Sequence, residues 1–400
     1  MKYKILITNI LLILIITTLL SGCTTFNNFQ ETFFDTDAEE NERIRIGVFE
    51  PLSGSEKENG ELELRGIELA HELFPKVLGK DVELVYADNK SDVDVAATVA
   101  EDLVEKKVSV VLGSYGSFLS IVGGEYFTEA KIPAIAITSS NPLVTSSSEY
   151  YFRTCFVESF QGIALAKYAF EQMGASTAAI LRDQNDDYAA AISQTFTDKF
   201  IQLTGNEDSI AKVIEYDSNQ KDFRSHLKSL NNLGVNTILL TGKNADSIKI
   251  MEQAKELGLQ FLFLGTDKWG TEEFLQAGGS AIEGAVFPTI FNPEAAATYN
   301  TNVTDAFLKA YREKYGKEQP PSAVALGFDA YLLAINAIKK AGTAVNGEAI
   351  KDELAATKNF SGVSGDISFD ENGDPIKSVA IQTITNGKFV HIYTAEPTWQ

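Results

Sequence analysis

The residues best suited to chemistry lie in short polar segments that follow predicted β-strands. Hydroxyl groups dominate the first two segments, at 113–117 and 138–142. Later segments supply an aromatic ring, a lysine and a carboxylate, at Tyr188, Lys243 and Asp267. Hydroxyls and helix N-terminal N–H groups suit an anion such as a carboxylate, whereas an acid suits an ammonium group. The set is therefore typical of a site for a small zwitterion.

Each of these residues also has a purely structural interpretation. Ser140 and Asn141 could cap the helix after Pro142. Asp267 could cap a helix or form a turn, and Tyr188 could pack in the core. Their joint placement after predicted strands favours binding, because ligands of open α/β sheets bind outside the carboxyl ends of the strands.

No catalytic or metal-binding pattern accompanies these segments. The three histidines are scattered along the chain without metal-ligand spacing. Two acidic segments begin like calcium loops but carry Tyr188 and Pro375 where such a loop needs glycine. The sequence also lacks a phosphate loop, a dinucleotide-binding pattern and a nucleophile elbow. We therefore expect no enzyme activity, no cofactor and no bound metal.

The elements that must position the polar segments alternate between strands and helices. Short β-branched runs predict strands at 44–49, 82–86, 109–112, 133–137, 178–181, 210–215, 237–240, 261–264 and 284–287. Helices are expected between them, at 61–74, 93–105, 118–130, 160–172, 189–203, 223–232 and 245–257. Three further helices, at 295–315, 322–341 and 348–357, precede a β tail over 366–369 and 380–393. Such alternation builds parallel sheets with helices on both faces.

The pattern restarts after residue 150, and the chain is 400 residues long. Both observations indicate two lobes rather than one core. The predicted fold class is α/β, with two doubly wound Rossmann-like lobes joined by a multi-strand hinge. We assign residues 43–157 with 290–366 to the N-terminal lobe, and 158–289 with 367–400 to the C-terminal lobe.

The composition is acidic and poor in cysteine. Lys and Arg total 34 against 55 Asp and Glu, a formal net charge of −21. Such a surface repels phosphate backbones, so nucleic acid is excluded as a partner. The two cysteines are Cys23, in a targeting segment, and Cys155. No internal disulfide is expected, and Cys155 is predicted to be a small buried residue.

The N-terminus is typical of a bacterial lipoprotein signal. Lys2 and Lys4 precede an apolar run at 5–20, and Leu20-Ser21-Gly22-Cys23 resembles a lipobox. A transmembrane anchor is the alternative, but the run is shorter than the ~20 residues that span a bilayer. We expect residues 1–22 to be removed, Cys23 to be lipidated, and 23–42 to form an acidic tether. The folded part would then lie outside the cytoplasm, anchored to the membrane.

From residue 43 to about residue 393 the chain resembles the type I periplasmic binding proteins of the branched-chain amino-acid (Leu/Ile/Val) class. The segments that carry the resemblance are Pro51-Leu52-Ser53-Gly54, 113–117, Ile132-Pro133, Ser139-Ser140-Asn141-Pro142, Phe152-Arg153-Thr154, Phe160-Gln161-Gly162, Tyr188 and Gly265-Thr266-Asp267. The resemblance implies a monomeric binding protein that delivers an amino-acid-like ligand to the permease subunits of an ABC importer.

The resemblance also implies roles for individual residues. Ser117 and Ser140 would bind the ligand carboxylate, Asp267 would bind the ammonium, and Tyr188 would close over the ligand from the second lobe. The complete set of ligand-binding candidates is Ser117, Thr138, Ser139, Ser140, Tyr188, Lys243 and Asp267, and the candidate pocket walls are Tyr115, Phe118 and Trp269.

Two departures from the family leave the ligand side chain open. Residues 55–60 are polar where the family usually has a proline, small residues and an aromatic. Lys243 stands where amino-acid binders often have an aromatic, and it could meet an anionic side chain or pair with a neighbouring acid. Two other functions stay open beside import: a sensory or assembly lipoprotein that uses the fold as an interaction module, and an enzyme with an unfamiliar site.

Overall fold

The computed structural model describes residues 43–217, 219–293, 301–316 and 319–395. The predicted signal peptide, the lipidation site Cys23 and the tether lie outside these residues. So do the first residues of the helix predicted at 295–315. Cys155 is buried, as predicted.

The first sheet has six strands in the order β2-β3-β1-β4-β5-β6. The strands are β1 (Ile44–Glu50), β2 (Lys76–Val77), β3 (Lys80–Asp88), β4 (Val110–Gly113), β5 (Ala134–Ala136) and β6 (Tyr151–Arg153). All pairs are parallel except the short β2 against β3. Every residue of β4 and β5 is buried, as expected for parallel strands covered on both faces.

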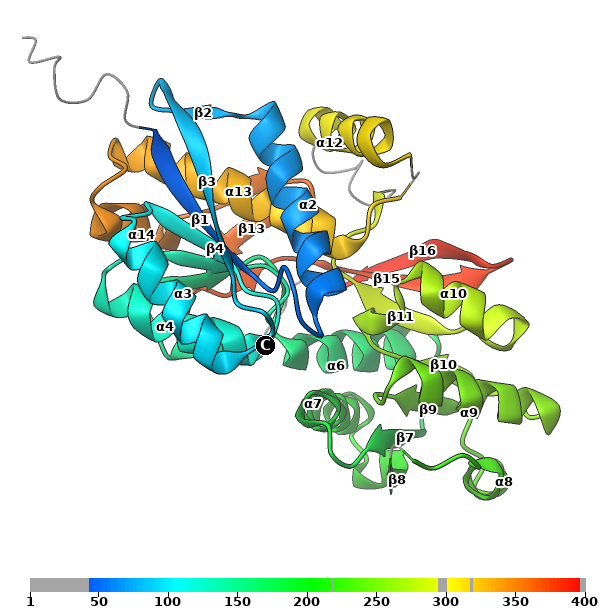
Figure 1. Ribbon diagram of the computed structural model, residues 1–400. Helices are drawn as coiled ribbons and strands as arrows, with labels where there is room; N and C mark the ends of the chain where they lie inside the picture. The colour runs from blue at the N-terminus through cyan, green and yellow to red at the C-terminus, as the bar shows by residue number, and fades with distance from the viewer. Residues whose placement is uncertain (1–42, 218, 294–300, 317–318, 396–400) are drawn as a thin grey trace, which may run out of the picture. The chain divides into compact units, whose positions relative to one another are not determined.

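Helices cover both faces of this sheet (Figure 1). The helices of this lobe are α2 (Lys57–Leu73), α3 (Val93–Glu105), α4 (Ser117–Glu129), α5 (Leu143–Ser146), α12 (Thr301–Tyr315), α13 (Ser322–Ala341) and α14 (Gly347–Ala355). Along β1 the side chains alternate: Ile46 and Val48 pack with α2 and α13, whereas Phe49 packs with α3 and α4. Helix α13 is long and apolar enough to cross a membrane, but it is mostly buried and forms part of this core.

Helices α2 and α13 cross closely because glycines face each other's backbone. A Cβ atom on Gly66 would lie 2.1 Å from the Val324 carbonyl oxygen, and one on Gly327 would lie 2.3 Å from the Glu63 carbonyl oxygen. Only glycine permits such an approach. The crossing fixes the position of Glu63 relative to the sheet.

The second sheet has seven strands in the order β16-β15-β11-β10-β9-β7-β8. They are β7 (Ala178–Asp183), β8 (Ile210–Tyr216), β9 (Thr237–Leu240), β10 (Leu262–Leu264), β11 (Val286–Thr289), β15 (Val379–Thr385) and β16 (Lys388–Ala395). The helices of this lobe are α6 (Glu158–Lys167), α7 (Asp187–Thr204), α8 (Arg224–Asn232), α9 (Asn244–Glu256) and α10 (Glu272–Gly278). The last two strands form a hairpin, with Asn386 and Gly387 at positive φ.

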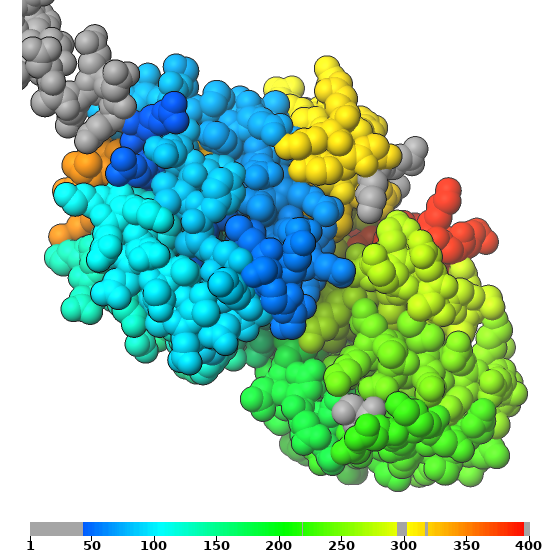
Figure 2. Space-filling model, viewed as in Figure 1, coloured from blue at the N-terminus to red at the C-terminus, as the bar shows by residue number. Residues whose placement is uncertain are grey.

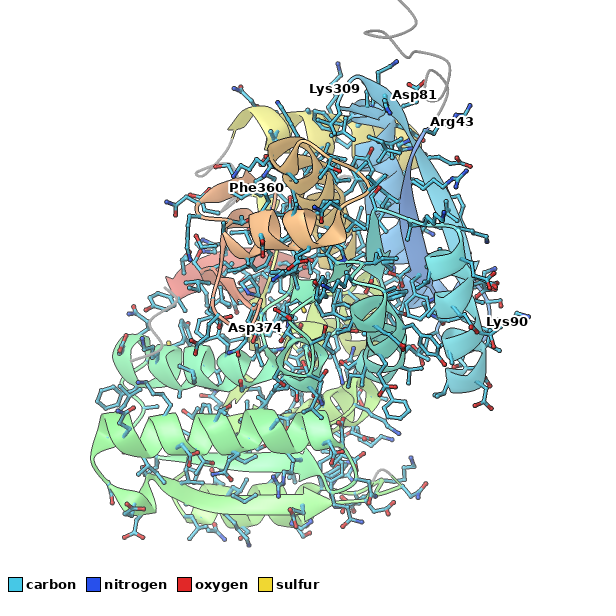
Figure 3. The ribbon with its side chains drawn as sticks, turned by 90° about the vertical axis from the view of Figure 1, so that its left-hand side faces the viewer. Arg43, Asp81, Lys90, Lys309, Phe360 and Asp374 are labelled. Carbon is cyan, nitrogen blue, oxygen red and sulfur yellow. The ribbon has the colours of Figure 1, made fainter. Side chains whose placement is uncertain are left out.

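A small third sheet places the last boundary between the lobes later in the chain than the predicted residue 366. It consists of β12 (Phe360–Gly362), β13 (Gly365–Phe369) and β14 (Pro375–Ile376). Two contacts attach it to the first lobe: the rings of Phe152 and Phe369 lie 5.1 Å apart, and Arg153 Nε lies 2.6 Å from Asp374 Oδ1. Figure 3 labels Phe360 and Asp374 on this segment. The chain therefore passes into the second sheet after Ile376 and not at residue 366, because residues 367–376 pack with the first lobe.

Candidate functional site

A cleft of about 660 Å³ lies between the two lobes, at the carboxyl ends of their strands. Figure 2 shows the first lobe in blue and cyan and the second in green and yellow-green, on either side of this region. All seven ligand-binding candidates and Tyr115 line the cleft. The first-lobe members follow β4 and β5, and the second-lobe members follow β7, β9 and β10. The site thus lies where the topology of open α/β sheets predicts it.

Two predicted wall residues do not line the cleft. Trp269 is fully buried in the second-lobe core, where its ring stacks on Phe274 at 5.1 Å beneath Gly265. It shares a short 3₁₀ turn with Asp267, and the turn sends the two side chains in different directions. Phe118 is 64% exposed and lies outside the lining. Because consecutive helical residues do not share a face, Phe118 cannot point the same way as Ser117. The wall assignment was wrong for both residues.

The second lobe presents a closed ring of hydrogen bonds around Asp267. The Tyr188 hydroxyl donates to Asp267 Oδ1 at 2.6 Å, and Gln161 Nε2 donates to the Tyr188 oxygen at 2.9 Å. The Asp267 amide donates to Gln161 Oε1 at 3.0 Å. Burial raises the pKa of Asp267, and the hydrogen bonds from Tyr188 and Gln161 oppose that rise. The carboxylate is thereby held in one orientation.

Gln161 was missing from the set of candidates. It reaches the site because α6 and α7 pack closely at Gly162, where a Cβ atom would lie 2.3 Å from Thr195 Oγ1. This approach brings Gln161 of α6 against Tyr188 of α7. The Phe160-Gln161-Gly162 segment carried the family resemblance, and it was the one signal that could have identified Gln161.

The two first-lobe loops are bonded to each other. Ser117 Oγ accepts from the Asn141 amide at 3.3 Å, and Ser139 Oγ donates to the Ser114 carbonyl at 2.7 Å. Ser139 is almost fully buried and also accepts from Ser120 Oγ. The Ser139 side chain therefore joins the loops. Helix α4 begins at Ser117 without a side-chain cap, which leaves its first amides available to an anion.

Glu158, the first residue of α6, is a second carboxyl group in the cleft that sequence reasoning missed. It lines the cleft, and Ser140 Oγ donates to its Oε2 at 3.3 Å. Burial raises the pKa of Glu158, and the hydrogen bond from Ser140 opposes this. No local pattern marked Glu158, because the strand before it, β6, was not predicted from the sequence.

Two lysines of the second lobe also line the cleft. Lys268 Nζ lies 3.9 Å from the centre of the Tyr188 ring, a cation–π contact. Lys243 is exposed and directly precedes α9. Among the described residues, its ammonium group has no hydrogen-bond or ion-pair partner. It is therefore free to meet a ligand group.

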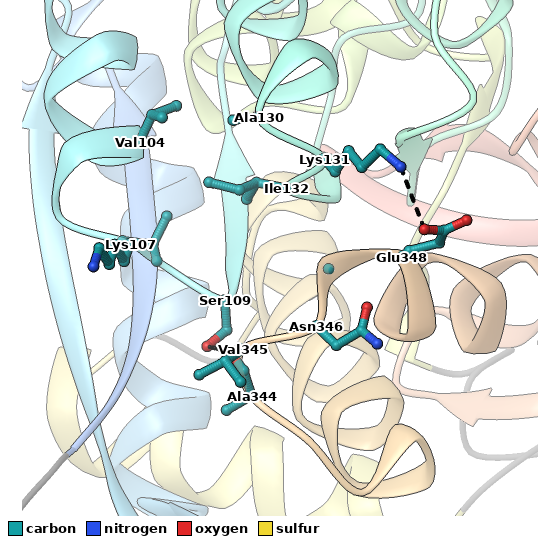
Figure 4. Close-up of a pocket in the computed structure, with 12 residues that line it drawn as sticks. Val104, Lys107, Ser109, Ala130, Lys131, Ile132, Ala344, Val345, Asn346 and Glu348 are labelled. Atoms are coloured by element: carbon teal, nitrogen blue, oxygen red, sulfur yellow. Dashed lines mark hydrogen bonds and ion pairs between the residues drawn. The ribbon is translucent and has the colours of Figure 1, made fainter.

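A second cavity, of about 460 Å³, lies at the opposite end of the first lobe (Figure 4). It is near the amino ends of β4 and β5, and Lys107, Ile132 and Val345 are among its lining residues. An ion pair between Lys131 and Glu348, 3.4 Å long, lies at its rim. Ligands of open α/β sheets bind at the carboxyl ends of the strands, so we do not assign this cavity as the ligand-binding site.

The chain is similar to one known family and to several known proteins. The family described as periplasmic binding protein matches residues 43–388. A Leu/Ile/Val-binding protein homolog from Brucella abortus (strain 2308) is 28% identical over 338 residues, which cover 83% of this chain and 87% of that protein.

Solved structures give similar results. The leucine binding protein LivK from Thermotoga maritima MSB8 is 35% identical, with a TM-score of 0.76, and the match covers 88% of this chain and 99% of that one. The branched-chain amino acid transporter substrate binding protein LivJ from Streptococcus pneumoniae, in complex with isoleucine, is 30% identical, with a TM-score of 0.74 and the same coverage. These relatives are binding proteins, which agrees with the expectation that the chain is not an enzyme.

Proposed function

The chain belongs to the periplasmic binding protein family, and from this membership we propose that it is the substrate-binding component of an ABC importer, which captures an amino acid between its lobes. One observation carries the choice of an amino acid. A partly buried, hydrogen-bonded carboxylate, Asp267, lies in the second-lobe wall of the cleft, and the uncapped start of α4 lies in its first-lobe wall. An α-amino acid offers charges that complement both.

In this proposal the first lobe binds the ligand carboxylate. The amides at the start of α4 and the Ser140 segment supply the hydrogen-bond donors, and the positive end of the helix dipole favours the negative charge. The bonds between the two loops keep these donors at a fixed separation.

The second lobe binds the ammonium group. Asp267 is its main partner, and Glu158 adds a second acid in the same cleft. The Tyr188 ring covers the ligand, while its hydroxyl stays on Asp267. Because the ligand then bridges both lobes, binding stabilises the closed arrangement, which is the form that a permease would recognise.

Polar groups are available to the ligand side chain beside the aromatic rings of the cleft. Asn59 and the unpaired Lys243 line the cleft, together with Leu62. These groups favour a side chain that ends in a hydrogen-bond acceptor or an anion over a purely aliphatic one. The relatives named above bind branched aliphatic amino acids, so this part of the proposal separates the chain from them.

The mode of membrane attachment rests on the sequence. Lys2 and Lys4, the apolar run at 5–20 and the Leu20–Cys23 segment support cleavage before Cys23 and its lipidation. We place the protein outside the cytoplasm, as a monomer tethered to the membrane next to its permease. Mass spectrometry of the membrane-bound protein tests this, because an intact residue 1 or an unmodified Cys23 would contradict it.

A thermal-shift screen of the full chain in detergent, against the twenty amino acids, sugars and short peptides, tests the proposed ligand class. An amino acid present at about 100 times its Kd should stabilise the protein by about 2.7 kcal/mol. Stabilisation by no amino acid would overturn the proposal and favour the interaction-module alternative.

A further inference from the structure

Two buried carboxyl groups lie directly behind the first-lobe ligand loops. Glu50 is the last residue of β1, and Glu63 lies on the inner face of α2. Both side chains are 0% exposed, and each carboxyl group influences the pKa of the other, so the two lie next to each other. Each carboxyl also holds one ligand loop. Glu50 Oε2 accepts from the Tyr115 amide at 2.8 Å, and Glu63 Oε1 accepts from the Thr138 hydroxyl.

The remaining two oxygens require a proton. Among the described residues, Glu50 Oε1 and Glu63 Oε2 are buried and have no N–H or O–H donor. Two ionised carboxylates in contact repel each other, and neither can donate a hydrogen bond. One proton shared between Glu50 and Glu63 satisfies both oxygens. All four oxygens of the pair then have a partner, and the pair carries a single negative charge.

We propose that Glu50 and Glu63 are positioning residues for ligand binding, which share one proton and together fix the Tyr115 amide and the Thr138 hydroxyl at the wall of the cleft. The inference extends the proposed function, since the loops that the pair holds are those assigned to the ligand. The pair itself does not line the cleft.

The surroundings of the pair favour retention of the proton. The charge of Glu63 acts on the Tyr115 and Tyr151 hydroxyls and on the Cys155 thiol, and burial raises the pKa of all three groups. They stay neutral at physiological pH and supply no positive charge. On the neighbouring helix α13, Asp329 accepts from the Val363 and Ser364 amides and is attracted electrostatically by Lys377. On β3, Asp88 accepts from the segment after β1. Burial raises the pKa of Glu63 to about 7 and that of Glu50 well above its ordinary value.

Glutamine at position 63 mimics the protonated pair. In Glu63→Gln the amide oxygen accepts from Thr138, and the amide N–H donates to ionised Glu50. This variant keeps all four partners and the same net charge but has no shared proton to lose. Glu63→Ala removes the support of Thr138 altogether. Glu61, on the same helix but partly exposed, gives the matched controls Glu61→Gln and Glu61→Ala.

Thermal unfolding without ligand tests the shared proton. The folded pair binds more protons than two unfolded glutamates, so stability should fall as pH rises from below the ordinary pKa through about 7. Between pH 5 and 8 the wild-type Tm should fall, relative to that of Glu63→Gln, by about 3 °C. Glu61→Gln should follow the wild type. Parallel curves for wild type and Glu63→Gln would overturn the shared proton, whatever the ligand of the protein is.

Titration with L-leucine and with L-glutamate at pH 7 tests the positioning role. The Kd of Glu63→Gln should lie within about threefold of the wild-type value. The Kd of Glu63→Ala should be at least about tenfold higher, because the loop that carries Thr138 is no longer held and must be ordered when the ligand binds. If Glu63→Ala does not fold, Glu50→Ala, which frees the Tyr115 amide, takes its place. Equal Kd values for wild type and the alanine variant would overturn the role. If the wild type binds neither amino acid, the titration uses the amino acid that the thermal-shift screen selects. Binding of none of the twenty amino acids would count against the proposed function, while the unfolding curves would still decide the shared proton.

Discussion

The hydroxyl of Tyr188 donates its hydrogen to Asp267 Oδ1 over 2.6 Å, so the residue that covers the cleft also orients the acid within it. The single hydroxyl hydrogen of Tyr188 is thereby used inside the protein. A ligand can still contact the Tyr188 ring, which the Lys268 ammonium group also contacts through a cation–π interaction. The two contributions of Tyr188 can therefore be separated by mutation.

Tyr188→Phe keeps the ring and removes the hydroxyl. We expect a Kd about five- to tenfold higher, from the loss of one hydrogen bond of about 1–1.5 kcal/mol to the carboxylate. Tyr188→Ala should weaken binding further, because the ring is lost as well. Isothermal titration calorimetry measures both effects, and equal affinities for the two variants would show that the ring makes no contribution.

Asp267→Asn tests the ammonium contact. The amide is nearly isosteric with the carboxylate but carries no charge, which leaves the ligand ammonium without its buried partner. We expect a loss of about 3–5 kcal/mol, enough to abolish measurable binding. Asp222→Asn, at a fully exposed position outside the cleft, is the matched control and should bind as wild type. An affinity of Asp267→Asn within threefold of wild type would show that the ammonium binds elsewhere.

The acids of the cleft predict how ligand binding depends on pH. Burial raises the pKa of Asp267 above its ordinary value of 3.8, and also that of Glu158. Each must be ionised to hold an ammonium group. Affinity should therefore be full near neutral pH and fall on acidification, beginning at a higher pH than an exposed aspartate would give. The same titration with Asp267→Asn should be flatter, and an unchanged profile would assign the effect to other groups.

Lys243→Ala should alter the choice of ligand more than the strength of zwitterion binding. The lysine has no ion-pair partner among the described residues, so its removal costs little stability. Competition between L-glutamate, L-glutamine and L-leucine provides the measurement. We expect the relative affinity for L-glutamate to fall, and an unaltered order of the three ligands would refute a role for Lys243 in selectivity.

Asp374→Ala should destabilise the fold. Arg153 is fully buried, and Asp374 lies 2.6 Å from its Nε. Removal of the acid leaves a buried guanidinium without its counter-charge, at a cost of about 3–5 kcal/mol. The exposed Glu371→Ala is the control, and the Tm of both variants measures the effect. A Tm of Asp374→Ala equal to the control would show that the hydrogen bonds from Arg153 to the Ser139 carbonyl and the Thr145 hydroxyl suffice.

The sequence predicted most of the fold because buried parallel strands leave a simple signal. The apolar runs that become β1, β4, β7, β9 and β10 stand out, and the order of strands and helices follows from them. Shorter strands such as β6 and β14 gave no such signal. Helix α2 begins at Lys57, before the predicted residue 61. Gly60 is a helical residue, and a Cβ atom there would lie 2.5 Å from the Pro51 carbonyl oxygen.

The candidate site was predicted less completely, for geometric reasons. The candidates that directly follow the carboxyl ends of strands were identified, because the topology of the sheet alone brings these positions to the cleft. Gln161 and Glu158 were missed because they begin a helix, and their partners are distant in sequence. The directions of Phe118 and Trp269 depend on local backbone geometry that the residue type does not reveal. The partners of Glu50 and Glu63 come from separate strands and loops, which no local pattern connects.

The position of Trp269 also has a spectroscopic consequence. Its indole is buried within the same short turn that carries Asp267. Any ligand that moves the Asp267 turn also changes the environment of this fluorophore. The chain has a second tryptophan, Trp399. In a Trp399→Phe background, the emission of Trp269 would report occupancy of the cleft without an added label, from a ring that never contacts the ligand.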